Sequence, residues 1–186
     1  MTGELVTYAF TTFNASKTIE RAINSAISQT YKNIEILVVD DNSNDNTVNI
    51  VETISRENNH LIRLIKLDQN KGVANARNVC VENARGEFIC FFDDDDYSYE
   101  SRIKSQLTEL IQFEKDHNDK NSFKRTALCY TDRLIHYENK KIIICKSMQI
   151  KQFNKYKIQY INSMLYASKF PSAGRPGSTA SCTLFA

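Results

Sequence analysis

Cysteine, proline and glycine are all scarce in this chain of 186 residues, and each scarcity excludes a class of protein. With only 2 prolines and 5 glycines, the composition is neither collagen-like nor of low complexity. The 5 cysteines are scattered and form no C-x-x-C pair. This pattern argues against a disulfide framework or a zinc site, and it favours reduced, mostly buried thiols.

Long apolar runs are also missing. No segment approaches the roughly 18 apolar residues that a membrane span needs. The N-terminal stretch MTGELVTYAF lacks the basic and apolar regions of a signal peptide. With 41% hydrophobic and 25% charged residues, the chain is typical of a soluble globular domain. We therefore expect a single domain over residues 1–186 and a cytoplasmic location, with the inner face of the cell membrane as the alternative.

Charge is unevenly distributed along the chain. Residues 1–120 contain 13 Lys and Arg against 20 Asp and Glu, whereas residues 121–186 contain 11 Lys and Arg against only 2 acids. The two parts are therefore expected to face different partners. The basic part suits an anionic acceptor or an anionic membrane surface, and no nucleic-acid-binding module is recognisable. A solvated basic face over a core helix explains the same residues.

Strand and helix patterns alternate along the first 120 residues. Apolar, β-branched runs predict strands at 5–11, 33–41, 61–67 and 87–92, and helical spacing of apolar residues predicts helices at 19–27, 48–54, 73–84 and 103–111. This alternation predicts an α/β fold with a mainly parallel central sheet flanked by helices. Further on, ALCYTDRLIHY and KIIICK predict a small antiparallel hairpin, and residues 150–165 a helix.

Two of the predicted strands end in carboxylates, at Asp40–Asp41 and at Asp93–Asp96. The carboxyl ends of parallel strands meet at one edge of a sheet, where ligands bind, so both clusters are expected there. Crowded carboxylates suit Mg²⁺ or Mn²⁺ bound together with substrate phosphates. In an extended chain Asp93 and Asp95 share a side and could hold one ion. The alternative is a solvated acidic loop that caps the following helix.

The sequence contains no glycine-rich phosphate loop of either common type. A bound nucleotide would therefore need a metal ion to neutralise its phosphates, which suits the aspartates. Arg77 lies in the stripe that also contains Val73, Cys80 and Ala84, so it points where apolar residues point. A buried arginine usually has an anionic partner, and the less favoured alternative is an arginine that extends its charged head into water.

Two other readings of the first acidic cluster have less support. Residues 41–52 approach the calcium-loop pattern, but Asn46 replaces the required glycine and a strand precedes the segment. The run ILVVDDN also opens like a response-regulator receiver, in which Asp93, Thr131 and Lys146 could take the phosphoacceptor, hydroxyl and lysine roles. In receivers, however, the acidic pair ends the first strand, whereas here a strand and a helix precede it.

Four segments together resemble glycosyltransferase family 2, whose members have the GT-A fold and transfer sugars with inversion. They are TTFNAS, AINSAISQTYKNIEILVVDDNSNDNT, NKGVANARN and ARGEFICFFDDDD, and they occur in this order over residues 5 to about 100. The resemblance implies a metal-dependent hexosyl- or N-acetylhexosaminyltransferase with a UDP-sugar donor and a glycan or lipid-linked acceptor. Residues 1–120 would be the nucleotide-sugar and metal half, and 121–186 part of the acceptor side.

The resemblance also implies roles for individual residues. The nucleotide-binding set is Thr11, Phe13, Asp40, Asp41, Arg77 and Asp94, and the metal ligands, for Mn²⁺ or Mg²⁺, are Asp93 and Asp95. In this set Asp41 would accept a hydrogen bond from the uracil ring, Asp40 would support that pocket, and Asp95 would be the more direct metal ligand. The family often has proline where this chain has Thr11.

The resemblance places the catalytic base on a segment after a strand that TASCTLFA (179–186) resembles. We therefore expect that the chain is truncated and that the base lies beyond Ala186. Asp132, within YTDRL, is the one candidate base inside the chain.

Overall fold

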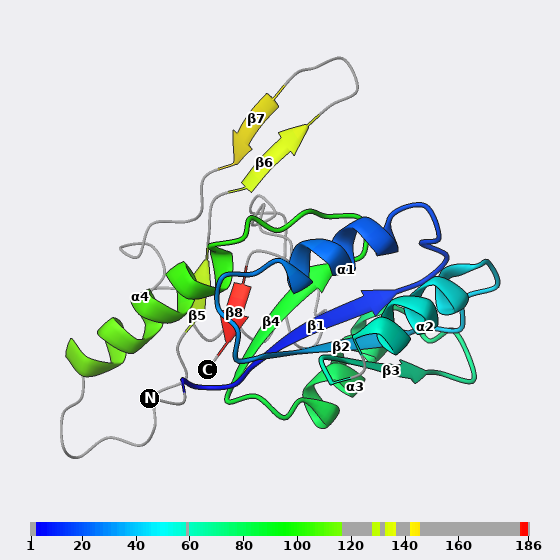
Figure 1. The fold of residues 1–186 in the computed structure, drawn as a ribbon, viewed down its shortest axis with the longest axis horizontal. Helices are drawn as coiled ribbons and strands as arrows, with labels where there is room; N and C mark the ends of the chain where they lie inside the picture. Colours follow the sequence, from blue (N-terminus) through cyan, green and yellow to red (C-terminus); the bar gives the residue numbers. More distant parts are fainter. Residues whose placement is uncertain are drawn as a thin grey trace, which may run out of the picture.

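The computed structural model describes residues 3–58, 60–116, 128–130, 133–136, 142–145 and 183–185. Four strands alternate with four helices over the first 116 residues, followed by four short strands (Figure 1). The elements are β1 (Val6–Thr12), α1 (Ile19–Ile27), β2 (Ile34–Asp40), α2 (Thr47–Glu57), β3 (Ile62–Lys66), α3 (Val73–Asn83), β4 (Phe88–Asp93), α4 (Arg102–Asp116), β5 (Leu128–Tyr130), β6 (Arg133–His136), β7 (Ile142–Cys145) and β8 (Thr183–Phe185). The helices and strands predicted for the first 116 residues are confirmed.

The main sheet has the strand order β3-β2-β1-β4-β8-β5. Its first four strands are parallel, and β8 runs antiparallel to both β4 and β5. The mainly parallel α/β sheet is therefore confirmed. The hairpin is confirmed for β6 and β7, which pair only with each other, but its first strand was predicted too long, because β5 belongs to the main sheet. The predicted helix at 150–165 and Asp132 lie outside the described residues.

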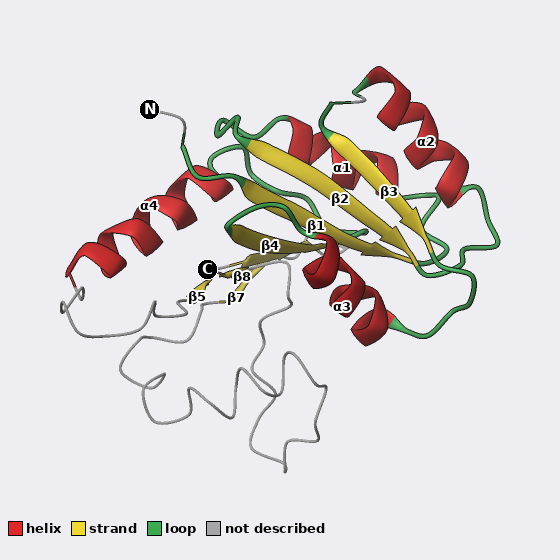
Figure 2. Ribbon diagram, turned by 90° about the horizontal axis from the view of Figure 1, so that it is seen from below, coloured by secondary structure: helices red, strands yellow, loops and turns green. Residues whose placement is uncertain are grey.

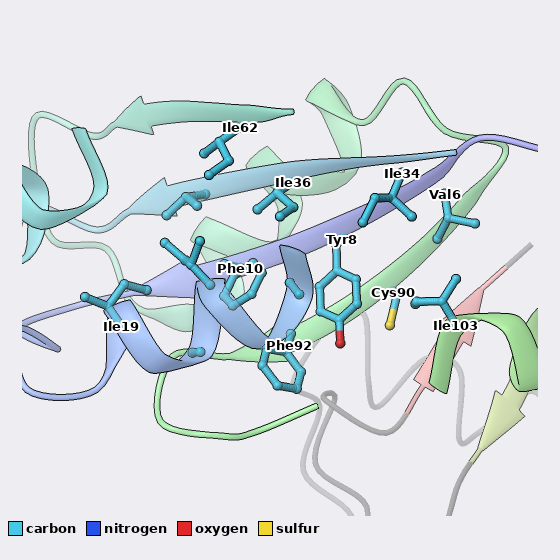
Figure 3. Packing of buried hydrophobic residues seen from close by; sticks show 14 of the residues in the cluster. Val6, Tyr8, Phe10, Ile19, Ile34, Ile36, Ile62, Cys90, Phe92 and Ile103 are labelled. Carbon is cyan, nitrogen blue, oxygen red and sulfur yellow. The ribbon is translucent and has the colours of Figure 1, made fainter. Parts of the chain in front are cut away.

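Helices cover both faces of the parallel strands (Figure 2). On one face, apolar residues of α1, α2 and α4 pack against alternate residues of β1, including Tyr8 and Phe10 (Figure 3). On the other face, Ala76 and Cys80 of α3 pack against Ala9 and Phe91. Strands that are buried on both sides need apolar residues at nearly every position, which explains the continuous apolar runs of β1 and β2.

The strand register places the two acidic clusters on either side of β1. Thr12 pairs with Asp40 of β2, and Thr11 pairs with Asp93 of β4. Both clusters therefore lie at the same edge of the sheet, as predicted, separated by about two strand spacings of ~4.8 Å. In the described part of the chain, no helix is long and apolar enough to cross a membrane.

Candidate active site

The run Asp93–Asp96 turns immediately after β4. The N–H of Asp96 donates a hydrogen bond to the carbonyl of Asp93 (3.3 Å), so Asp94 and Asp95 occupy the two central positions of a turn. The prediction that Asp93 and Asp95 share a side of an extended chain is therefore wrong in its geometry. We call residues 93–96 the aspartate turn.

The carboxylates of the aspartate turn have different surroundings. Asp93 forms an ion pair with Arg77 at 3.1 Å, which is the anionic partner expected for this arginine. One carboxylate oxygen of Asp94 accepts a hydrogen bond from the N–H of Phe13 (3.2 Å). Asp95 is exposed. Arg77 also lies over the ring of Phe91, with its guanidinium carbon 6.0 Å from the ring centroid.

Burial raises the pKa of both Asp93 and Asp94 above the ordinary aspartate value. Arg77 acts in the opposite direction on the pKa of Asp93, while the neighbouring charges of Asp96 and Asp95 raise it further. The turn therefore holds negative charge that the protein's own cations only partly compensate. A bound cation would relieve this repulsion.

The other acidic cluster is bound into the protein by hydrogen bonds. The two carboxylate oxygens of Asp41 accept the N–H groups of Lys71 (2.9 Å) and Gly72 (2.7 Å), at the start of α3. Asp40 accepts the N–H of Ser43 (2.9 Å) on one oxygen and its hydroxyl on the other. Both aspartates are almost completely buried, with exposed fractions of 2% for Asp40 and 3% for Asp41.

The loops after β1 and β2 are joined by hydrogen bonds. The N–H of Asn14 donates to the hydroxyl of Ser43 (2.9 Å), and that of Ala15 donates to the hydroxyl of Thr47 (2.8 Å). Asn14 and Asn42 adopt positive φ angles of 54° and 64°, which asparagine tolerates better than most residues. These sharp turns bring Phe13, which is 44% exposed, beside the aspartate turn.

A hollow of about 230 Å³ lies between the end of β3 and the first turn of α3. Its walls are formed by Lys66, Leu67, Asp68, Gln69, Lys71 and Asn75. The hollow therefore adjoins the loop whose N–H groups bind Asp41. Its wall contains two lysines and one aspartate, and Lys66 also forms an ion pair with Glu52 at 3.0 Å.

The donor set of the aspartate turn fits a hard divalent cation that is shared with a ligand. Within the described residues, no three His, Cys, Asp or Glu side chains form a group that could hold a metal ion by themselves. Mg²⁺ commonly takes only one or two protein carboxylates and completes its coordination with substrate phosphates and water. Asp95, exposed at the tip, is the carboxylate of the turn that is most open to such an ion.

Sequence reasoning missed a set of residues that hold the segment after the aspartate turn. This set consists of Tyr8, Arg21, Ser25, Gln29, Ser98 and Arg102. A signal was available, because Ser25 is a polar residue that is buried in a helix otherwise packed by isoleucine and alanine, and Gln29, just beyond the end of that helix, is buried as well. Buried polar groups of this kind need hydrogen-bond partners.

The family profile described as glycosyl transferase family 2 matches residues 9–168, and the chain belongs to this family. Among the curated proteins, it is 41% identical over 114 residues to UDP-Glc:alpha-D-GlcNAc-diphosphoundecaprenol beta-1,3-glucosyltransferase WfaP of Escherichia coli. This match covers 59% of the chain and 44% of WfaP. The chain thus spans less than half the length of the curated relatives it matches.

Solved structures show the same fold. One match is TarS 1–349 of S. aureus in complex with UDP, with 32% identity and a TM-score of 0.51, covering 62% of the chain and 33% of TarS. Another is the mannosyltransferase PcManGT from Pyrobaculum calidifontis in complex with GDP-Man and Mn²⁺, with 26% identity, a TM-score of 0.54, and coverage of 56% and 32%. The predicted GT-A fold is confirmed by these matches.

Proposed function

We propose that this chain is the donor-binding part of a metal-dependent glycosyltransferase that uses a UDP-sugar and inverts the anomeric carbon. One observation of the structure supports this most directly. Two acidic clusters lie at one edge of a parallel sheet, one buried and hydrogen-bonded, the other exposed at its tip. The alternative predicted from the sequence, a receiver module, has no support, because its acidic pair would end β1, whereas here that pair ends β2.

Asp41 and the hollow beside it are the proposed site of the nucleoside. Each carboxylate oxygen of Asp41 already accepts one backbone N–H, and its second lone pair can accept the ring N–H of uracil. At about 230 Å³ the hollow is smaller than a typical pocket for a drug-sized ligand, so it suits one ring rather than a whole nucleotide sugar. Thr11 and Phe13, on β1 and the loop after it, would border the same site.

The aspartate turn is the proposed site of the donor's diphosphate, through a shared divalent cation. Asp95 would bind the cation directly, with Asp93 held ready by Arg77 and Asp94 held by Phe13. When bound, the cation supplies stabilisation of the negative charge on the leaving diphosphate. The chain's own residues fix the positions of these carboxylates before the donor arrives, which lowers the reorganisation needed in the reaction.

The transfer itself would be a single displacement. The acceptor hydroxyl oxygen attacks the anomeric carbon, the bond from that carbon to the diphosphate oxygen breaks, and the hydroxyl proton passes to a carboxylate base. WfaP, by its name, acts on a sugar carried by diphosphoundecaprenol, which supports a lipid-linked acceptor for this chain. Such an acceptor also supports contact of the basic residues 121–186 with an anionic membrane surface.

Calorimetry with nucleotides tests the donor site. We expect UDP to bind in the presence of Mn²⁺ and to bind at least tenfold more weakly when EDTA replaces the metal. ADP and GDP should bind more weakly than UDP, because Asp41 is proposed to accept the ring N–H of uracil. Asp95→Asn should remove most of the metal-dependent affinity, and Asp96→Asn should remove less.

The control for this experiment is Glu57→Gln, which removes an exposed acidic side chain at the C-terminal end of α2, away from the aspartate turn and the hollow. It should leave UDP binding unchanged. UDP binding of full strength in EDTA would overturn the metal-dependent donor site. Equal affinities for UDP, ADP and GDP would show that the site binds the diphosphate without selecting the base, and the proposed uracil contact of Asp41 would be wrong.

A further inference from the structure

The segment from the second half of the aspartate turn to the start of α4 lies along one side of α1. We call residues 95–100 the strap, which shares Asp95 and Asp96 with the turn. Arg21 and Ser25 of α1 and Gln29, two residues beyond the end of the helix, bind its backbone. Arg21 donates to the carbonyl of Asp95, Ser25 accepts the N–H of Ser98 (3.1 Å), and Gln29 donates to the carbonyl of Tyr99 (2.8 Å). The four-residue spacing places Arg21 and Ser25 on one face of α1.

Gln29 forms several hydrogen bonds in this interface. It is fully buried, and its amide nitrogen lies within hydrogen-bond distance of the Ser98 hydroxyl (3.1 Å) as well as the Tyr99 carbonyl. Its amide oxygen accepts the N–H of Ile103 (3.1 Å), in the first turn of α4. One side chain therefore joins the end of α1, the strap and the start of α4.

Tyr8 fixes the same point from the sheet. Its ring stands off β1 with the hydroxyl oxygen pointing away from the strand (Figure 3), and that hydroxyl donates to Ser98 (2.6 Å). The guanidinium of Arg102 donates to the Tyr8 hydroxyl (3.0 Å) and lies over the rings of Tyr8 and Phe92. Burial raises the pKa of Tyr8, so its hydroxyl stays protonated and able to donate.

The two tyrosine side chains of the strap point outward, away from the hydrogen bonds that hold its backbone. Ser98 is buried, while Tyr97 and Tyr99 on either side of it are 58% and 61% exposed. The apolar side chains therefore contribute little burial, and polar contacts of the backbone hold the segment. Such an arrangement fixes where a loop lies, rather than adding to the core.

We propose that Arg21, Ser25 and Gln29 are positioning residues, which set the position of the aspartate turn through the strap. This inference rests on the proposed role of the turn in binding metal and donor. Arg21 binds the carbonyl of Asp95, inside the turn itself, and Ser25 and Gln29 hold the next residues. These bonds of Arg21 and Ser25 are made to backbone atoms of the strap, so the contribution of α1 is geometric.

Two possible roles of Arg21, electrostatic and positional, predict opposite changes in Mn²⁺ affinity when its side chain is replaced. Removing a positive charge beside a cation site should strengthen Mn²⁺ binding if Arg21 acts only through its field. Losing one hydrogen bond that places Asp95 should weaken Mn²⁺ binding by about fivefold, given a net value near 1 kcal/mol for such a bond. The direction of the change therefore distinguishes positioning from electrostatics.

The experiment measures Mn²⁺ affinity by electron paramagnetic resonance, with and without UDP, for the wild-type chain, Arg21→Met, Arg21→Lys and Ser25→Ala. We expect Arg21→Met and Ser25→Ala to bind Mn²⁺ about fivefold more weakly and Arg21→Lys to recover part of the loss. Asn24→Ala, on the exposed side of the same helix, is the matched control and should bind as the wild type does. Hydrogen exchange on the same proteins reports the strap directly, through the amides of Asp96 and Ser98.

Each outcome decides one of the two claims. If the wild-type chain binds neither Mn²⁺ nor UDP, the proposed donor site is wrong. If it binds both, and the amide of Ser98 exchanges faster in Ser25→Ala while Mn²⁺ affinity stays unchanged, the positioning role is wrong. Tighter Mn²⁺ binding in Arg21→Met, without any change in Ser25→Ala, would assign Arg21 a purely electrostatic effect and overturn the proposal.

Discussion

The two acidic clusters at the sheet edge differ in how the protein treats their charge. Asp40 and Asp41 are nearly inaccessible, and both oxygens of each carboxylate accept hydrogen bonds from neighbouring loops. In the aspartate turn, Asp93 pairs with a half-exposed arginine, burial raises the pKa of Asp93 and Asp94, and Asp95 is exposed. Asp40 and Asp41 hold the backbone of the loops in place through hydrogen bonds, whereas the aspartate turn carries negative charge that is only partly compensated.

This difference has a functional meaning. A carboxylate whose oxygens are committed to backbone N–H groups stabilises the fold and presents a fixed edge to a ligand. Carboxylates that repel each other near the surface destabilise the fold slightly and gain from a cation. Substitution of Asp41 should therefore lower stability as well as nucleotide binding, whereas substitution of Asp95 should lower mainly cation binding.

The largest expected effect on stability is that of Asp41→Asn. The new amide presents a donor to one of the two N–H groups of Lys71 and Gly72, which leaves that buried N–H without an acceptor. We expect a loss of about 3 kcal/mol in the free energy of unfolding, measured by urea denaturation. Asp68→Asn, in the nearby wall of the hollow, is the control and should change stability by less than about 0.5 kcal/mol.

A smaller loss is expected from Gly72→Ala, which alters the same loop through its backbone. Gly72 has φ 85° and ψ 163°, a region that is essentially restricted to glycine. No atom lies within 4 Å of the added Cβ, so strain alone should account for a loss of about 2 kcal/mol. Calorimetric unfolding measures this value. If Gly72→Ala leaves the free energy of unfolding unchanged, the loop that binds Asp41 can change its backbone conformation without destabilising the fold.

Much of this fold could be predicted from the sequence, because period-2 and period-3.6 patterns are local. The positions of β1 to β4 and α1 to α4 follow from such patterns, and so does the shared edge of the acidic clusters. The pairing of β8 between β4 and β5 could not be predicted, since it joins segments more than fifty residues apart. Strand order across such distances depends on tertiary packing.

The site was predicted less completely, for an equally physical reason. The partners of Arg77 and Asp41 depend on contacts between different loops, which no spacing reveals. The aspartate turn was predicted as extended chain, but the hydrogen bond between Asp96 and Asp93 bends it. The predicted nucleotide and metal roles remain predictions, and Asp132 lies outside the described residues.

The ion pair between Arg77 and Asp93 gives a pH-dependent prediction. Arg77→Met should lower the free energy of unfolding by about 1–2 kcal/mol at neutral pH, because the pair is only partly exposed and Asp93 loses its compensating cation. Burial raises the pKa of Asp93 above its unfolded value, so the folded protein takes up this proton first as pH falls. Protonated Asp93 needs no cation, and the difference between wild type and variant should shrink as pH falls through that raised pKa.

Urea denaturation of both proteins between pH 4 and pH 8 measures this difference. Arg56→Met is the matched control, because Arg56 pairs with Glu52 on the exposed side of α2. It should change stability by less than about 0.5 kcal/mol at every pH. A loss in Arg77→Met that stays constant with pH would show that the methylene packing of Arg77 on Phe91, rather than its charge, stabilises the fold.

The smallest expected effect on stability is that of Asp95→Asn. The Asp95 side chain is exposed, and its charge raises the pKa of Asp93 and Asp94. Neutralising it should therefore raise the free energy of unfolding slightly, by less than about 0.5 kcal/mol. Because exposed charges are screened by salt, the gain should be larger at 10 mM than at 500 mM sodium chloride, and urea denaturation at both concentrations measures it. Asp41→Asn, by contrast, should be equally destabilised at both, since its loss comes from a buried hydrogen bond. If Asp95→Asn loses 2 kcal/mol or more in the free energy of unfolding, the aspartate turn stabilises the fold as the first cluster does, and the expected difference in stability between the two clusters is wrong.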